Sequence, residues 1–363
     1  MHTLRSTTRL ATLTLVFAAL AMAAAPSAQA GTSIHVEEVK GGLNGPAAFT
    51  FLPNGNIVYL ERGTGEVRIL NPKTKFDRLF FRIPGIDGEG ERGALGVAVH
   101  PRWPDQRFIY VYATRRSHGS LRNQILRIRS KDGEGSGFAV ILSTPASSSP
   151  YHNGGRIAFG PDGRLYAIVG DGHDSVNSQD LTKNLRGKIL GLRADGGVPG
   201  DNPLIGGDRT RVFAYGLRNS FGFTFDPGTG VLWETENGPT CNDEVNVIVG
   251  GENYGWGPTE ACPDTNRDGP SPELPVWRYN DTIGITGATF CHGCGLGFQG
   301  DLFWGAVNDG VLRRAKLNGP RDGIDSVMQN VLTAPGGSIL SMESAPKGRI
   351  YFSTFSAIYR LAT

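Results

Sequence analysis

Residues 48–59 read AFTFLPNGNIVY: an apolar segment, a Pro-Asn-Gly turn, and a second apolar segment that ends in an aromatic residue. Apolar segments on both sides of such a turn are typical of a β-hairpin. The same phrase recurs five times, with weaker copies at the last two places: residues 96–112, 156–166, 223–233, 300–304 and 345–352. Self-similarity of this kind indicates a repeat architecture.

Several copies are followed by one more strand-like segment, at residues 66–70, 124–129, 188–193 and 310–314. Each unit is therefore predicted to be a four-stranded antiparallel blade, which buries its faces against neighbouring blades. We predict an all-β fold, a six-bladed β-propeller, in which the segment from His35 to Val39 completes the last blade. A β-sandwich or a solenoid is the alternative. The copies are further apart than the roughly 40–50 residues of common propeller repeats, so long loops are expected at one end.

The first thirty residues have the pattern of a secretory signal. Arg5 and Arg9 precede an apolar run that is too short to span a bilayer, and small residues end at Ala30. We expect residues 1–30 to be a signal peptide and residues 31–363 to be a single β-propeller domain, in the periplasm or secreted. An uncleaved membrane anchor is the alternative.

The charge of the remaining chain is balanced. Residues 1–30 hold two arginines and no acid, so 36 − 2 = 34 basic residues face 34 acidic ones. A neutral surface gives no reason to propose nucleic acid or a membrane as a partner. A closed ring needs no second chain for stability, so a monomer is expected.

All four cysteines follow residue 240. An even number in an exported chain favours disulfides, and Cys241 with Cys262 is the preferred first pair. Cys291 and Cys294 are expected to form a tight disulfide. A redox pair or half of a metal site are the alternatives, although no second Cys/His cluster exists to complete a zinc site.

One candidate base stands in the loop before the third copy, where residues 151–156 read YHNGGR. His152 precedes a strand and two glycines, which suits close approach of the backbone to a ligand. Asp171 follows in the same predicted blade and could orient the imidazole. Such a pair is suited to take a proton from a hydroxyl group.

Two further segments carry polar groups. Arg218 and Asn219 open the fourth predicted blade, where they could donate hydrogen bonds to a carboxylate or to sugar oxygens. Residues 236–256 contain a long loop that is rich in oxygen donors. Calcium prefers carboxylate and carbonyl oxygens, so this loop is a candidate calcium site.

The motifs together resemble the soluble sugar dehydrogenases that use pyrroloquinoline quinone, the glucose and sorbosone dehydrogenase group. The resemblance runs from about Gly42 to Tyr359 and rests on four ordered motifs: GALGVAVHP at 93–101, HNGGR at 152–156, GLRN at 216–219, and DEVN with NYGW at 243–256. It implies a six-bladed propeller that holds the quinone over its channel. It also implies a small sugar as substrate and an external electron acceptor.

The resemblance assigns roles to individual positions. His152 would take the proton of the substrate hydroxyl while hydride passes to the quinone, and Asp171 would support it. Arg218 and Asn219 match an Arg-Asn pair that contacts the quinone and the substrate, which places Arg218 among the catalytic residues, and Glu91 stands where family members usually carry a glutamine that contacts the quinone. Calcium would lie near the positions matching Gly238, Pro239, Glu244 and Tyr254. The cofactor would perform the redox chemistry and the protein would orient it.

The chain departs from the family pattern at basic positions. A lysine is usual where this sequence has Asn308, and Arg-x-Arg is usual where it has Ser338 to Leu340. Those groups neutralise the three carboxylates of the quinone, and each lost pair costs roughly 1.5–3 kcal/mol. If the quinone binds, Arg313, Arg314 or Lys347 are possible replacements.

Two other functions fit the same residues. A propeller without those basic groups could bind carbohydrate or a protein without redox chemistry. A calcium-dependent hydrolase or lactonase could use His152 and a metal to activate water. The fold alone does not choose among these functions.

Overall fold

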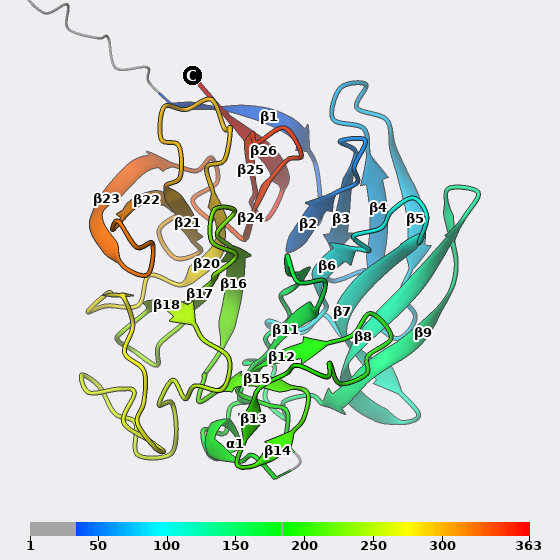
Figure 1. The fold of residues 1–363 in the computed structure, drawn as a ribbon. Coiled ribbons are helices and arrows are strands. Elements are labelled where there is room, and N and C mark those ends of the chain that lie inside the picture. The colour runs from blue at the N-terminus through cyan, green and yellow to red at the C-terminus, as the bar shows by residue number, and fades with distance from the viewer. Residues whose placement is uncertain (1–33, 183) are drawn as a thin grey trace, which may run out of the picture. The chain divides into compact units, whose positions relative to one another are not determined.

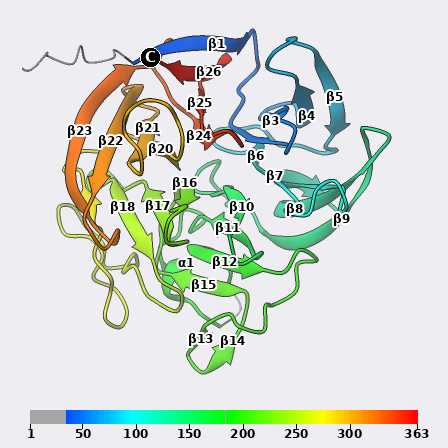
Figure 2. The ribbon, with the colours of Figure 1, turned by 45° about the horizontal axis from the view of Figure 1, so that its top comes forward.

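Six four-stranded antiparallel sheets form a closed ring in the computed structural model, which describes residues 34–182 and 184–363. Figure 1 shows the sheets as successive blades in chain order. Figure 2 shows that the first strands labelled there lie nearer the middle of the ring than the later strands of their blades. The predicted six-bladed propeller is confirmed. The proposed signal peptide lies outside the described residues.

The first two blades follow the first two copies of the repeated phrase. Blade one contains β2 (Ala48–Phe51), β3 (Ile57–Glu61), β4 (Glu66–Leu70) and β5 (Asp77–Arg82). Blade two contains β6 (Ala94–Val99), β7 (Phe108–Ser117), β8 (Ser120–Lys131) and β9 (Glu134–Pro145).

The middle blades carry the longest irregular segments. Blade three contains β10 (Ile157–Phe159), β11 (Leu165–Val169), β12 (Lys188–Leu192) and β15 (Val212–Tyr215). Its loops hold the short helix α1 (Val176–Gln179) and a hairpin of β13 (Leu204–Ile205) and β14 (Asp208–Arg209). Blade four contains β16 (Ser220–Phe225), β17 (Leu232–Glu236), β18 (Glu244–Ile248) and β19 (Trp277–Arg278).

The last two blades complete the ring. Blade five contains β20 (Ile285–Phe290), β21 (Leu302–Ala306), β22 (Val311–Leu317) and β23 (Ile324–Thr333). Blade six contains β24 (Ser341–Ser344), β25 (Ile350–Ser353), β26 (Ala357–Ala362) and β1 (His35–Gly41). β1 pairs with β26 from His35 opposite Ala362 to Gly41 opposite Ala357, so the predicted closure by the first strand is confirmed.

The hydrophobic core lies between the blades. Each of the six blade interfaces within the described residues has its own cluster of buried apolar side chains. Between blades three and four, for example, Ile168 and Ala214 pack with Phe223 and Leu232. An isolated blade would leave such side chains in water, so burial drives the stacking of neighbouring blades.

The alternation of strand direction sorts the loops into two ends. Loops that enter a first strand, or join a second strand to a third, emerge at one end, which we call the mouth. Turns between first and second strands, and between third and fourth strands, emerge at the other end, which we call the base. Residues of the predicted catalytic motifs all belong to loops at the mouth.

Two disulfides fasten long connections. Cys241 bonds Cys262, as predicted, and joins the loop after β17 to the loop after β18. Cys291 bonds Cys294 in the extended turn between β20 and β21. Within residues 34–363, apart from position 183, no helix has the length and apolar character needed to cross a membrane.

Candidate active site

His152 and Asp171 form a hydrogen-bonded pair at the mouth of the ring. His152 lies in the loop before β10 and Asp171 lies just after β11, so blade three supplies both. The distance from His152 Nδ1 to Asp171 Oδ1 is 2.7 Å. The two residues are only 7% and 1% exposed. With Nδ1 engaged by the carboxylate, Nε2 is the ring nitrogen available to a ligand.

The carboxylate of Asp171 is held by two more donors. The backbone N–H of His173 donates to Oδ1 at 2.7 Å. The indole Nε1 of Trp256 donates to Oδ2 at 2.9 Å. Trp256 belongs to the long loop between β18 and β19, which reaches the mouth along the end of β15, where Asn253 pairs with Tyr215, so blade four fixes a carboxylate of blade three. Both carboxylate oxygens are thereby hydrogen-bonded, as a buried acidic group requires.

The backbone around His152 is unusual. His152 itself has φ +57°, a left-handed conformation that few residues other than glycine adopt. Gly154 and Gly155 also have positive φ, and a Cβ atom on Gly155 would lie 2.4 Å from Cβ of Leu95. The glycine pair thus lets this loop approach blade two closely. Strained backbone of this kind tends to occur at functional sites.

Glu91 connects His152 to Asn219. Oε2 of Glu91 accepts hydrogen bonds from the backbone N–H of His152 at 2.9 Å and from Nδ2 of Asn219 at 3.1 Å. Oδ1 of Asn219 accepts from the backbone N–H of Gly154 at 3.2 Å. Loops of three blades therefore meet at the candidate base. Four predicted site residues, His152, Asp171, Glu91 and Asn219, lie in one network.

Arg218 lies on the other side of Trp256. Its guanidinium carbon is 5.4 Å from the centroid of the Trp256 ring, and Nη1 donates to the carbonyl of Asn237 at 2.9 Å. Burial lowers the pKa of Arg218, while the charges of Asp171 and Glu236 oppose that shift. Arg218 thus contributes positive charge beside the His152–Asp171 pair.

A cavity of about 190 Å³ opens at the mouth and takes lining residues from all six blades. Its basic lining residues are Arg62 and Arg156, and its acidic one is Glu91. The other lining residues are apolar or small: Ala47, Gly90, Leu95, Gly154, Phe221, Thr286, Val307, Leu340 and Phe355.

The two arginines of the cavity were missed by sequence reasoning. Nη1 of Arg62 donates to the carbonyls of Gly88 and Arg92 at 3.2 and 2.8 Å. Arg156 donates from Nε to the carbonyl of Phe221 at 3.0 Å. Burial lowers the pKa of both arginines. The negative charge of Glu91 opposes this shift at Arg62, and that of Glu343 opposes it at Arg156, but neither arginine forms an ion pair among the described residues.

The basic groups considered as replacements point elsewhere. Arg313 pairs with Asp309 at 2.5 Å, and the guanidinium of Arg314 stacks 3.7 Å from the ring centroid of Phe298. Neither lines the mouth cavity. Ser338 carries no charge, and its hydroxyl donates to the carbonyl of Val307.

Three of the four predicted calcium positions border one small hollow. Gly238, Pro239 and Glu244 line it together with Arg218 and Glu236. Tyr254 does not, because its buried hydroxyl donates to the carbonyl of Val247 at 2.7 Å and accepts from the backbone of Val249. Within the described part of the chain, no group of three or more His, Cys, Asp or Glu side chains has the geometry to hold a metal ion. A calcium site here would depend on backbone carbonyls.

A cluster of buried glutamates adjoins that hollow. Burial raises the pKa of Glu234 to about 8 and that of Glu244 to about 7, and the pKa of Glu236 is also raised. The negative charge of Glu244 raises the pKa of Glu234 further, and the charges of Glu234 and Glu244 together raise that of Glu236. Oε1 of Glu234 and Oδ1 of Asn246 are buried without a hydrogen-bond partner among the described residues. An unpaired carboxylate oxygen and an unpaired amide oxygen are both ligands that a calcium ion accepts.

A family model described as Glucose / Sorbosone dehydrogenase matches residues 43–360. The chain is 28% identical over 349 residues to the aldose sugar dehydrogenase YliI of Escherichia coli K12, covering 90% of this chain and 91% of that protein.

Solved structures agree with that match. A structure described as an oxidoreductase (glucose dehydrogenase) of Thermus thermophilus has a TM-score of 0.80 at 33% identity, over 91% of this chain and 100% of that one. The PQQ-bound form of an aldose sugar dehydrogenase from Streptomyces coelicolor has a TM-score of 0.78 at 27% identity, over 91% and 97% of the two chains.

Proposed function

The chain belongs to the glucose and sorbosone dehydrogenase family, and on this premise we propose that it oxidises a hydroxyl group of an aldose or a related compound, with pyrroloquinoline quinone as cofactor. The family predicted from the sequence motifs is confirmed. So is the class of enzyme, an oxidoreductase that acts on CH–OH groups.

The observation that carries the proposal is the buried His152–Asp171 pair at the mouth, where the backbone N–H of His152 donates to Glu91, a residue that lines the mouth cavity. The 2.7 Å hydrogen bond holds the imidazole with its second nitrogen available for a substrate hydroxyl. As Nε2 takes the hydroxyl proton, the imidazole becomes positively charged. Asp171 stabilises that charge, and Trp256 keeps the carboxylate in position.

The residues at the mouth suit an acidic planar cofactor. Arg62 and Arg156 would hold its carboxylates, Asn219 and Arg218 would orient it, and Leu95 and Phe221 would contact its rings. When bound, the quinone would supply the two-electron acceptor for the hydride that leaves the substrate carbon. We therefore propose that arginines of blades one and three replace the basic groups that blades five and six lack.

We also propose that calcium binds near Gly238, Pro239 and Glu244. The support is the excess of buried carboxylate in blade four and the orphaned oxygens of Glu234 and Asn246. Calcium would lower the electrostatic cost of that cluster and would order the loop that follows β17.

The test is a quinone titration of the purified chain from residue 31, with calcium present, followed by a dye-linked assay over a panel of sugars. We expect saturable binding and dye reduction that depends on the sugar. Absence of binding at micromolar quinone would contradict the proposal.

A second function has one observation in its favour. The walls that blades five and six contribute to the mouth are neutral: Thr286, Val307, Leu340 and Phe355. A propeller that binds carbohydrate without redox chemistry would need no basic groups there. Sugar binding by calorimetry, without dye reduction after incubation with quinone, would favour this function.

We further propose that the chain is exported as a single propeller domain cleaved after Ala30, that it acts as a monomer, and that it passes electrons to an external acceptor. The leader pattern and two disulfides support export. Cell fractionation, the mass of the exported chain and its light scattering would test these points.

A further inference from the structure

A cleft of about 520 Å³ lies at the base of the ring, between blade one and blade six. Blade one contributes the turns 53–56 and 71–73, and blade six contributes the turn 345–347 and side chains of β25 and β26. Both blades contribute base turns, whereas His152 and Asp171 belong to loops at the mouth. The cleft is therefore separate from the candidate active site.

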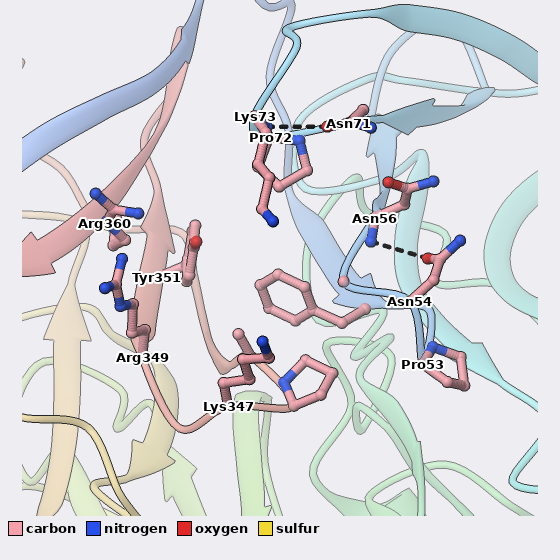
Figure 3. Close-up of a pocket in the computed structure, with 14 residues that line it drawn as sticks. Pro53, Asn54, Asn56, Asn71, Pro72, Lys73, Lys347, Arg349, Tyr351 and Arg360 are labelled. Atoms are coloured by element: carbon pink, nitrogen blue, oxygen red, sulfur yellow. Dashed lines mark hydrogen bonds between the residues drawn. The ribbon is translucent and has the colours of Figure 1, made fainter.

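The polar lining of the cleft carries positive charge. Lys73 enters from blade one, and Lys347, Arg349 and Arg360 enter from blade six. Figure 3 shows the ammonium groups of Lys73 and Lys347 extending into the gap from opposite sides. No acidic residue is among those that line it in the described part of the chain. Arg360 alone of the four forms an ion pair there, with Glu37 on the neighbouring strand β1.

Apart from three asparagines, the remaining lining is apolar. The rings of Phe51 and Tyr351 meet edge to face, with centroids 5.1 Å apart and planes at 68°. Pro53, Pro72 and Pro346 lie around them. Aromatic and proline surfaces offer contact area to a planar ring and lose little conformational entropy when they bind one.

The turns that form the rim are fixed before any ligand arrives. Oδ1 of Asn71 accepts from the backbone N–H of Lys73 at 3.0 Å, and Oδ1 of Asn54 accepts from that of Asn56 at 3.0 Å. The turn from Ala345 to Arg349 is closed by a backbone hydrogen bond of 2.8 Å. Preformed walls reduce the entropic cost of binding.

We propose that this cleft binds a small organic anion with at least two negative groups on a planar apolar body. The lysines and arginines would engage the negative groups, and Phe51 and Tyr351 would contact the ring. The site does not depend on the proposed dehydrogenase chemistry, because none of its residues belongs to the mouth.

Isothermal titration with benzene-1,2,4-tricarboxylate at low salt tests the proposal. We expect saturable binding that weakens as salt rises, and weaker binding of the saturated cyclohexane analogue and of inorganic phosphate. In the double variant Lys73→Gln/Lys347→Gln, affinity should fall by about tenfold or more, because two charge-assisted contacts are lost. Both lysines are exposed, so the variant is expected to fold, and circular dichroism checks this.

The matched control is Lys316→Gln, which removes an exposed lysine of β22 that does not line the cleft. It should bind the tricarboxylate as the unaltered chain does. The proposal is overturned if the tricarboxylate does not bind saturably, if the double variant binds it as well as the control, or if the saturated analogue binds equally well. Because the mouth also has arginines, unchanged binding by the double variant would identify the mouth as the site.

Discussion

At the scale of single residues, His152 combines a strained backbone with a fully oriented side chain. Its φ of +57° is held by contacts on both sides: Glu91 accepts from its N–H, and Asp171 binds its ring. The surrounding structure thus determines where the imidazole points. A substitution that tests its chemistry must tolerate the same backbone conformation.

His152→Asn meets that condition, because asparagine adopts positive φ more readily than most residues. It cannot serve as a base of similar strength. We expect kcat to fall by roughly a hundredfold to ten-thousandfold, the usual range for loss of a general base, while quinone binding changes little. Steady-state kinetics and quinone titration measure the two effects separately. Unchanged kcat would exclude His152 as the base.

Trp256→Phe tests the support of Asp171. The phenyl ring keeps most of the packing but removes the N–H that donates to Oδ2 at 2.9 Å. A buried carboxylate oxygen that loses its partner costs about 1–3 kcal/mol, so we expect kcat to fall by roughly tenfold or more. The Kd for quinone should stay within about twofold if Trp256 acts only through Asp171. A larger change in Kd than in kcat would contradict this role.

Local strand order predicted the pair that lies within one blade, and the family resemblance added Glu91 and Asn219 from the neighbouring blades, but the contributions of Trp256, Arg62 and Arg156 were missed. His152 and Asp171 are separated by one hairpin, so local strand order predicts their proximity. Trp256 reaches Asp171 from blade four, and its motif was noticed without its role. Arg62 and Arg156 line the same cavity only because the ring closes, and no local sequence pattern predicts that closure.

At the scale of elements, the connection from β17 to β18 concentrates the proposed calcium chemistry. The disulfide between Cys241 and Cys262 ties this connection to the later loop that leads into β19. Three buried glutamates stand on the two strands that it joins. The connection is thus held by a disulfide and lies beside three buried carboxyl groups whose negative forms a cation would stabilise.

Calcium should therefore stabilise the protein. With free calcium at 100 times its Kd, we expect the free energy of unfolding to rise by about 2.7 kcal/mol. Glu244→Gln should remove most of that gain, whereas Glu134→Gln, at the exposed start of β9, should retain it. Chemical unfolding with calcium or with a chelator measures the difference. Equal stability in the two conditions would contradict a calcium site.

The prediction of elements from sequence was best where the repeated phrase is undisturbed. Residues 66–70 were predicted as a strand and are β4. The fifth copy was weak because the turn between β20 and β21 is lengthened by residues 291–301, which include the second disulfide. The predicted copy, residues 300–304, therefore overlaps β21 but not β20, which lies before the inserted turn.

At the scale of the whole molecule, the middle of the ring holds opposite charges in a confined space. Glu343, on β24, lies near Arg156. Burial raises the pKa of Glu343 to about 7, and the positive charge of Arg156 only partly offsets that effect. The folded state thus retains a proton that the unfolded chain releases at lower pH.

This difference predicts a pH dependence of stability. Between about pH 4.5 and pH 7 the folded state binds more protons than the unfolded state, so the free energy of unfolding should fall as pH rises through this range. Glu343→Gln should remove that component, and Glu134→Gln should not. Denaturant unfolding at pH 5 and pH 8 measures the effect. The same pH dependence in both variants would show that Glu343 is not its source.

The pairing of β1 with β26 has a consequence for how the chain can be arranged. Because the first and last strands of the described chain lie side by side in blade six, the order of the blades around the ring does not depend on where the polypeptide starts. A circular permutant that joins residue 34 to residue 363 by a short linker, and begins instead at the exposed turn near Asp132, should form the same six interfaces. The natural order determines only which blade combines an early strand with late ones, so blade six can form its four-stranded sheet only after β26 has been synthesised.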